Sequence, residues 1–178
     1  VLPHLRTYPS LKVWIAGCST GEEVYSLAIL FREEGLYDRT LFYATDINPD
    51  ALRAAEAGVY ALDRLRKFTE NHQKSGGRSS LSDYYTADYG RAVCDRSLSA
   101  RVVFSDHSLV TDAAFAEMQL ISCRNVMIYF DAPTQRKVLE RIHRVLKPGG
   151  MLFVGHAENF SESRDLFTLR GKTVYERR

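Results

Sequence analysis

The sequence predicts an α/β fold in which helices cover both faces of a mostly parallel sheet. Short apolar runs alternate with longer amphipathic segments along most of the 178 residues, and this alternation is typical of parallel strands joined by right-handed crossovers. The first apolar run, Leu11–Ala16, leads through a glycine-containing turn into a helical pattern that begins at Glu22. A strand, a tight turn and a helix in this order form the ligand-binding edge of doubly wound domains.

Three amphipathic segments are expected to be helices. Glu22–Glu34 carries apolar residues at helical spacing, and Ser19 and Thr20 are its expected caps. Asp50–Ala57 begins directly after an Asn-Pro pair and stops at a glycine, which are typical start and stop signals. Ala132–Leu146 is the longest and is expected to end at the sequence KPGG.

The remaining apolar runs are expected to be strands. Near the end of the chain, Phe167–Leu169 and Thr173–Tyr175 flank an Arg-Gly turn, which predicts a hairpin that adds an antiparallel edge to the sheet. The other predicted strands are Leu41–Thr45, Arg101–Ser105, Leu120–Cys123 and Met151–Gly155.

One region, residues 63–100, interrupts the alternation. Its polar part reads NHQKSGGRSSLS and is followed by several tyrosines. The region is too long for a simple connection. We interpret it as a flexible segment followed by a small β insertion at about residues 83–100.

Composition limits the possible functions. The net charge of +2 does not suggest nucleic-acid binding, and no apolar run approaches the ~20 residues that span a bilayer. Cys18, Cys94 and Cys123 are scattered, which favours reduced thiols in a cytoplasm. None has metal-ligand spacing to a second Cys or His, so no metal site is expected.

The turn after the first strand indicates the chemistry of the ligand. Gly17 and Gly21 allow the backbone to approach a ligand closely. Glu22 and Glu23 lie where a pyrophosphate would bind at the helix N-terminus, and their charges repel phosphate and favour a cation. S-adenosylmethionine carries a sulfonium and an ammonium and has no phosphate. The turn therefore favours a methyltransferase over a dinucleotide enzyme.

Polar residues also follow the second and third strands. Asp46 lies twenty-five residues after Gly21, where an acid can accept hydrogen bonds from both ribose hydroxyls. The alternative is a turn residue for the next helix. Ser108 and Leu109 lie in a loop expected to border the adenine, where Leu109 would cover the ring. The alternative is an ordinary polar loop.

The last two strand ends complete this edge of the sheet. Arg124 and Asn125 follow the fourth strand, where the reactive group of the cofactor is expected. Tyr129 either presents its hydroxyl to that group or is a core aromatic with a wet tip. Glu158 and Asn159 follow the fifth strand, where they either support the site from its rim or cap a loop, and the structural role is favoured.

Taken together, these stretches resemble the CheR family of S-adenosylmethionine-dependent methyltransferases that act on bacterial chemoreceptors. The matching stretches appear in family order between Leu11 and Tyr175. The resemblance implies a class I methyltransferase (Rossmann-like) catalytic domain over residues 1–178. It also implies methylation of glutamate side chains to γ-methyl esters. The stretches are AGCSTGEEVYSLA, ATDIN, ISCRNVMIYF, LKPGG, GHAENF and LRGKTVY.

The resemblance also implies roles for individual residues. Glu22 matches the acid near the methionine part of the cofactor, and Asp46 matches the ribose acid. Ser108 and Leu109 match an Asn-Leu pair beside the adenine, with Ser in place of Asn.

In the ISCRNVMIYF stretch, Arg124 and Asn125 match a cofactor-binding pair, and Tyr129 matches a tyrosine close to the transferred methyl. Gln119 stands where many class I methyltransferases have Asp.

The implied partner is the cytoplasmic domain of methyl-accepting chemoreceptors. Members that bind a receptor pentapeptide have a longer, glycine-rich β loop, whereas only Gly90 remains in Tyr84–Leu98 here. We therefore expect a pentapeptide-independent, cytoplasmic monomer. The family's N-terminal helical domain and Phe-Phe-Arg motif, whose arginine orients the substrate carboxylate, are not matched. The early Arg6 stands in an unrelated context, HLRTYP.

Other functions remain open from the sequence. One alternative is a methyltransferase for another substrate, such as a small molecule or RNA. A second is a non-catalytic cofactor-binding module in a larger signalling protein, which the unmatched arginine motif favours. A dehydrogenase is disfavoured by the two acids at the first helix.

Overall fold

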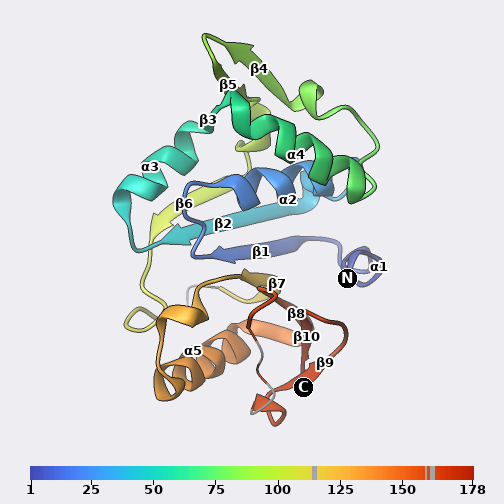
Figure 1. Ribbon diagram of the computed structural model, residues 1–178. Helices are drawn as coiled ribbons and strands as arrows, with labels where there is room; N and C mark the ends of the chain where they lie inside the picture. Colours follow the sequence, from blue (N-terminus) through green and yellow to red (C-terminus); the bar gives the residue numbers. More distant parts are fainter. Residues whose placement is uncertain (114–115, 159, 161–162) are drawn as a thin grey trace.

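The computed structural model describes residues 1–113, 116–158, 160 and 163–178, and its centre is a seven-stranded sheet (Figure 1). The strand order is β6-β2-β1-β7-β8-β10-β9. From β6 to β8 neighbouring strands are parallel, and β10 is antiparallel to both of its neighbours. This confirms the predicted fold class with its C-terminal hairpin. The strands are β1 (Leu11–Ala16), β2 (Thr40–Asp46), β6 (Val102–Asp106), β7 (Met118–Cys123), β8 (Leu146–Val154), β9 (Phe167–Leu169) and β10 (Val174–Arg177).

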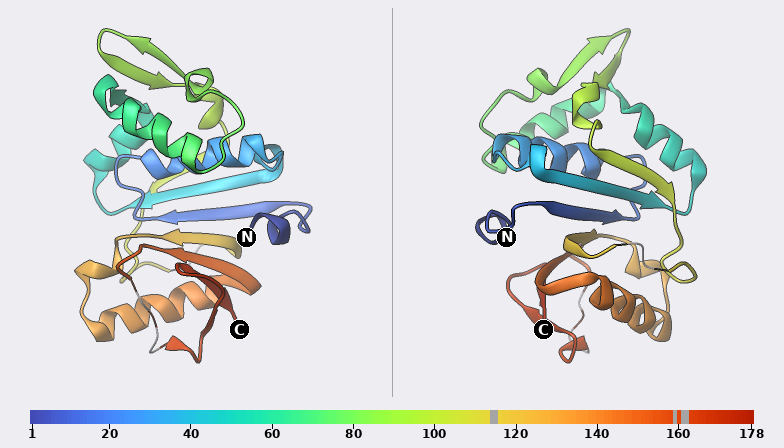
Figure 2. Two further views of the ribbon diagram at one scale, coloured as in Figure 1. Left: turned by 45° about the vertical axis from the view of Figure 1, so that its right-hand side comes forward. Right: turned by 180° about the vertical axis from the view of Figure 1, so that it is seen from behind.

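Helices cover both faces of the sheet, and the alternation of side chains along β1 separates two cores. Val13 and Ile15 pack with apolar residues of α2 (Glu22–Glu33) and α3 (Pro49–Ala57). Trp14 and Ala16 pack with those of α5 (Ala132–Val145). In both views of Figure 2, strands β2, β1 and β7 lie between α2 and α5. Burial on both faces explains why the strands read as continuous apolar runs.

The boundaries of the three predicted helices agree with the sequence to within one residue, but the predicted cap of α2 does not. The side chain of Asn48 caps α3 by accepting from the Asp50 amide at 2.9 Å, and α3 ends at a left-handed glycine. The residue that precedes α2 is Gly21, with φ 90°, and no side chain caps it. The prediction that Ser19 or Thr20 caps this helix is therefore wrong. The Thr20 hydroxyl donates instead to a carboxylate within the helix.

The KPGG sequence is not a loop between α5 and the next strand. The helix ends at Val145 and β8 begins at once, with Leu146 paired to Met118. The register then shifts, so that Leu120 pairs with Met151. Residues 147–150 form a bulge within β8 opposite β7, and this bulge contains the left-handed Gly149.

A second, smaller sheet lies at one end of the molecule, opposite α5 (Figure 1). It has the order β3-β5-β4 and includes the hairpin of the predicted β insertion. Asp88 pairs with Arg91, so Tyr89 and Gly90 form a two-residue turn, both with positive φ. Its strands are β3 (Val59–Ala61), β4 (Tyr85–Asp88) and β5 (Arg91–Cys94).

The helix α4 (Leu62–Lys74) lies against this sheet. The prediction of a flexible segment in this region is therefore wrong for the residues up to Lys74, which are helical. Only Leu65 is buried, and Phe68 meets Tyr60 edge to face at 6.2 Å. Ala61 precedes the helix and supplies no capping side chain. The largely polar composition of α4 and the missing cap explain why the sequence did not predict it as a helix. The short helices are α1 (Leu2–Leu5), η1 (Tyr37–Arg39), η2 (Leu81–Tyr84), η3 (Arg96–Leu98) and η4 (Met127–Tyr129).

Glu33, at the end of α2, joins this helix of the main sheet to α4 and the segment that follows it. Its carboxylate accepts from the amides of Arg78 at 3.0 Å and Ser79 at 3.1 Å, and from the Tyr84 hydroxyl at 3.1 Å. His72 of α4 approaches it at 3.3 Å. The chain after α4 is thus attached to the end of α2 through this carboxylate, and an ion pair between Arg78 and Glu34 at 2.9 Å adds to the contact. None of the helices in the described ranges is long and apolar enough to cross a membrane.

Candidate functional site

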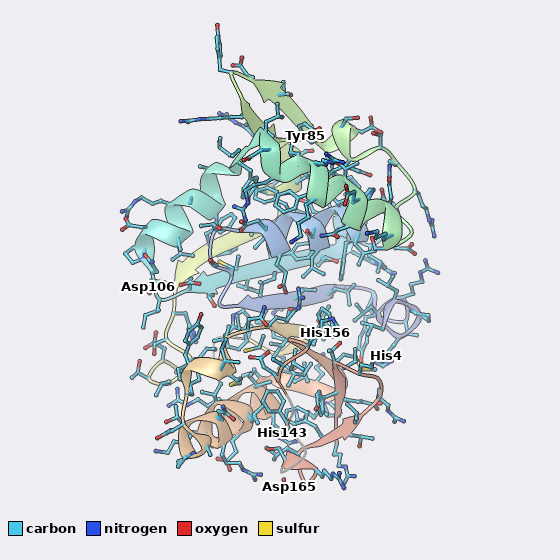
Figure 3. All side chains as sticks on the ribbon, in the orientation of Figure 1. His4, Tyr85, Asp106, His143, His156 and Asp165 are labelled. Carbon is cyan, nitrogen blue, oxygen red and sulfur yellow. The ribbon has the colours of Figure 1, made fainter. Side chains whose placement is uncertain are left out.

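A cleft of about 1630 Å³ opens at the edge of the sheet where the parallel strands end. Figure 3 marks this edge with Asp106, the last residue of β6. The cleft continues between α2 and α4, where Leu27 and Phe68 line it. The structure brings all eight predicted site residues to its walls. They are Gly17, Glu22, Asp46, Ser108, Leu109, Arg124, Asn125 and Tyr129.

Gly17 brings the turn after β1 against the loop after β7. Its φ is 75°, and a Cβ placed on it would overlap the Val126 side chain. Its amide donates to the Thr45 carbonyl at 2.8 Å, as does that of Cys18. A residue without a side chain is therefore required where two strand ends meet.

Asp46 orders the same turn. One carboxylate oxygen accepts from the Ser19 amide at 2.8 Å and the other from the Asn48 amide at 2.9 Å. The residue therefore has the turn role that was one of its two alternatives. A carboxylate has about four lone-pair positions, so each oxygen retains capacity for a hydroxyl donor from a ligand in the cleft.

The two acids at the start of α2 have different partners. Glu22 forms an ion pair with Arg64 of α4 at 2.8 Å and accepts from the Thr20 hydroxyl at 2.6 Å. The Arg64 side chain is about half exposed. The pair links α4 to the N-terminus of α2 beside the cleft. Sequence analysis missed Arg64, because the helix that carries it was not predicted.

Glu23 is the partner of Arg124. The guanidinium donates to Glu23 at 3.0 Å, and the Ser122 hydroxyl donates to the other carboxylate oxygen. The guanidinium carbon lies 5.0 Å from the centre of the Phe153 ring. Arg124 is therefore held by charge and by an aromatic face. The sequence singled out both charges but did not pair them.

The loop after β6 turns sharply at Ser108. Its amide donates to Asp112 at 2.8 Å, and its hydroxyl accepts from the Thr111 amide at 3.3 Å. Leu109 is half-buried against the α5 core. Asp106 lies within β6 and is not among the residues that line the cleft.

Asn125 and Tyr129 lie on the loop after β7. Asn125 has φ 57°, a left-handed conformation that Asn tolerates better than most residues. Tyr129 is 79% exposed, so it is not the core aromatic that was one of its two interpretations. Its side chain lines the cleft while its ring remains open to solvent.

Two residues have structural contacts. Glu158 is buried and accepts hydrogen bonds from the backbone of residues 125–127, which supports the structural role favoured for it. Asn159 lies outside the described residues. Gln119 is buried, and its side-chain oxygen accepts from the Lys12 amide at 2.6 Å, joining β7 to β1. The position where many class I enzymes have Asp thus has a structural function here.

Two of the acids at the cleft have their charge balanced by arginines, Glu22 by Arg64 and Glu23 by Arg124. Burial, together with the charges of Asp46 and Glu23, raises the pKa of the Cys18 thiol to about 12. At the cleft, Asp46 can accept hydroxyl groups and Leu109 offers an apolar surface for a flat ring, which fits the ribose and the adenine of S-adenosylmethionine. Over the described residues, no group of three or more His, Cys, Asp or Glu side chains is placed to hold a metal ion.

Solved structures with this fold define the class of protein. The N-methyltransferase NodS from Bradyrhizobium japonicum, solved with S-adenosylhomocysteine, superposes with a TM-score of 0.55 at 13% identity, over 99% of this chain and 83% of that one. StiE O-MT gives a TM-score of 0.51 at 16% identity, over 84% and 38%. The fold is that of class I S-adenosylmethionine-dependent methyltransferases.

Sequence relatives define the family. A model described as "CheR methyltransferase, SAM binding domain" matches residues 1–176, and the chain belongs to this family. It is 54% identical to "Putative methyltransferase Cher3" of Pseudomonas putida, over 94% of this chain and 62% of that protein. It is 41% identical to the "Chemotaxis protein methyltransferase" of Klebsiella aerogenes, over 97% and 60%. The chain thus spans about three-fifths of the length of these relatives.

Proposed function

We propose that this protein transfers the methyl group of S-adenosylmethionine to glutamate side chains in the cytoplasmic domain of bacterial chemoreceptors, giving γ-methyl esters. The observation that carries the proposal is the convergence of all eight predicted site residues on one cleft at the carboxyl edge of the sheet. The family supports the cofactor. The name "Chemotaxis protein methyltransferase" of the Klebsiella aerogenes relative supports the receptor as substrate.

The proposed chemistry needs alignment rather than proton transfer. When bound, S-adenosylmethionine supplies an electrophilic methyl: the carboxylate oxygen bonds to the methyl carbon as the carbon–sulfur bond breaks, and its electron pair remains on sulfur. A glutamate carboxylate is already ionised at neutral pH, so no general base is required. The work of the chain is to hold the oxygen, carbon and sulfur in line.

Individual residues have proposed roles in this alignment. Asp46 accepts the ribose hydroxyls, and Glu22 attracts the cationic methionine part. Asn125 and the Glu23-paired Arg124 form the wall beside the methyl. Tyr129 positions the methyl or the incoming carboxylate with its exposed hydroxyl.

We also propose that a receptor's C-terminal pentapeptide is not required. The β4–β5 connection is a two-residue turn, which leaves no extended loop between these strands to hold a peptide. A receptor lacking its last five residues should be methylated at the same rate as the intact receptor. The protein is proposed to act as a monomer in the cytoplasm, where the methylated receptor segments lie.

Methyl transfer to receptor tests the function directly. The full-length protein is incubated with S-adenosylmethionine carrying a tritiated methyl and with membranes containing chemoreceptor. Labelled receptor should release volatile tritium in alkali, because a methyl ester hydrolyses to methanol whereas an N-methyl group is stable.

The control acceptor is the same receptor with its labelled glutamates changed to alanine, which should remain unlabelled. Alkali-stable label, or label only on small molecules or RNA, would point to a different substrate. A protein that binds S-adenosylhomocysteine but labels no receptor would instead be a binding module.

A further inference from the structure

Glu158 lies behind the loop after β7 and is only 6% exposed. One carboxylate oxygen accepts from the amides of Val126 at 2.9 Å and Met127 at 2.8 Å. The other accepts from the amides of Asn125 at 2.9 Å and Gly155 at 2.7 Å. Four backbone N–H groups from two separate strand ends therefore converge on one side chain.

These bonds use the full accepting capacity of an ionised carboxylate, which has about four lone-pair positions. A neutral amide at the same place has one accepting oxygen, and its NH₂ group would face N–H donors. Hydrogen bonds to a charged acceptor are also shorter and stronger than neutral ones. The arrangement is thus specific for a carboxylate.

The geometry around Glu158 leaves the loop little freedom. A Cβ on Gly155 would overlap the Asn125 side chain and lie 2.8 Å from Glu158 Oε2. Asn125 is left-handed, a conformation that costs energy for a residue with a side chain and persists where its surroundings impose it. The hydrogen bonds from Asn125, Val126 and Met127 supply that constraint.

The constrained residues belong to the wall of the cleft. Asn125 and Val126 line it, with Arg124 on one side in the chain and Tyr129 on the other. Met127, whose amide is held by Glu158, is the first residue of η4, which ends at Tyr129. Displacing this backbone would move the side chains placed beside the methyl.

We propose that Glu158 is a positioning residue of the methyl-transfer site: its carboxylate sets the backbone of Asn125–Met127 and so places Arg124, Asn125 and Tyr129 toward cofactor and substrate. The inference rests on the proposed function. Cofactor affinity and turnover then depend on a side chain that acts on the cleft only through the loop, which a role in stability alone does not require.

The test compares Glu158→Gln and Glu158→Asp in the full-length protein. Calorimetric titration with S-adenosylhomocysteine should show affinity about tenfold to a hundredfold weaker for Glu158→Gln, the range expected when charged hydrogen bonds are lost. Glu158→Asp keeps the charge and all acceptors on a shorter side chain, and it should retain more affinity. Amide exchange should accelerate at residues 125–127 in both variants.

A matched control separates positioning from stability. Val138→Ala removes buried volume from α5 and should lower the melting temperature without changing affinity, because Val138 is buried in the α5 core and does not line the cleft. If Glu158→Gln does not fold, Gly155→Ala perturbs the same contacts independently and should weaken affinity and lower kcat. For methyl transfer, kcat should fall in the Glu158 variants beyond any change in Val138→Ala.

Failure of the positioning role and failure of the proposed methyl-transfer function give different results. A wild-type protein that binds S-adenosylhomocysteine but methylates no receptor overturns the proposed function alone. Folded Glu158 variants with wild-type affinity, wild-type kcat and only a lower melting temperature overturn the positioning role alone. In that case Glu158 would serve stability, as Val138 does.

Discussion

Asp46 illustrates how one side chain at this site combines a structural and a proposed binding task. One oxygen holds the turn after β1 through the amide of Ser19, and the other holds the turn that leads into α3 through the amide of Asn48. Those bonds fix the direction of the remaining lone pairs before any ligand arrives. A ribose diol would therefore meet an acceptor that is already ordered, so little side-chain entropy is lost on binding.

We expect Asp46→Asn to weaken binding of S-adenosylhomocysteine by about 1–3 kcal/mol, because the amide presents fewer acceptors to the hydroxyls. Calorimetric titration measures the change. Asp50→Asn is the control, since Asp50 is an exposed acid on α3 that does not line the cleft. Unchanged affinity in Asp46→Asn would remove the ribose role.

Tyr129 should act on turnover rather than on folding. Because Tyr129 is 79% exposed, Tyr129→Phe should leave the free energy of unfolding and the affinity for S-adenosylhomocysteine unchanged. Loss of a hydroxyl that contacts the reacting groups should lower kcat about tenfold or more. Tyr89→Phe, at the exposed tip of the β4–β5 hairpin, is the control. A variant with weaker affinity but normal kcat would contradict the catalytic role.

At the scale of elements, the site depends on how closely strand ends approach each other. The turn after β1 and the loop after β7 meet where Gly17 faces Val126. Neither element contributes through a long side chain at this contact. The approach of the two strand ends is therefore set by the backbone of Gly17 against the side chain of Val126.

Gly17→Ala should lower the free energy of unfolding by about 1–3 kcal/mol, because the new methyl group meets Val126 in a backbone conformation that already disfavours alanine. Gly35→Ala separates the steric contact from the cost of the backbone conformation. Gly35 has a similar φ of 68° but open space around it, so only the backbone cost of roughly 1 kcal/mol applies. Urea unfolding of both variants gives the comparison, and equal losses would show that the contact with Val126 is unimportant.

At the scale of the whole molecule, Glu33 joins the main sheet to the part that carries α4. Burial alone would raise the pKa of Glu33. The opposing effects are larger: the amides of Arg78 and Ser79 and the hydroxyl of Tyr84 donate hydrogen bonds to the carboxylate, and the charge of His72 also lowers the pKa. The pKa therefore lies below its ordinary value of 4.5. A carboxyl group whose pKa is lower in the folded protein stabilises the fold above its unfolded pKa, and this stabilisation is lost as the pH falls through the folded pKa.

We therefore expect Glu33→Gln to be less stable than wild type at pH 7 and to show a weaker loss of stability on acidification below about pH 5. Urea unfolding across this pH range measures both effects. Glu70→Gln removes an exposed acid paired with Arg66 on the outside of α4 and is the control. If Glu33→Gln and wild type lose stability in parallel with falling pH, Glu33 does not contribute to the acid sensitivity.

Sequence reading succeeded where a signal is local. Apolar runs, the Asn48 cap and the glycines at turns place β1, β2 and α3 to within a residue or two. Because the carboxyl ends of parallel strands lie on one edge, motifs at those ends could be expected to converge, and they do. It failed at α4, which is mostly polar, buries only Leu65 and has no capping side chain at its start.

What the sequence by itself determined is the order of elements, the edge of the sheet that carries the site and the acidic character of that edge. The order and the edge follow from burial periodicity and chain direction, and the acids follow from the residues at the strand ends; all of these are properties of neighbouring residues. Tertiary structure alone decided which charges meet. Glu22 with Arg64, Glu23 with Arg124 and Glu158 with the backbone after β7 are pairs distant in the chain. Such contacts depend on packing and register across the whole domain, which no local pattern encodes.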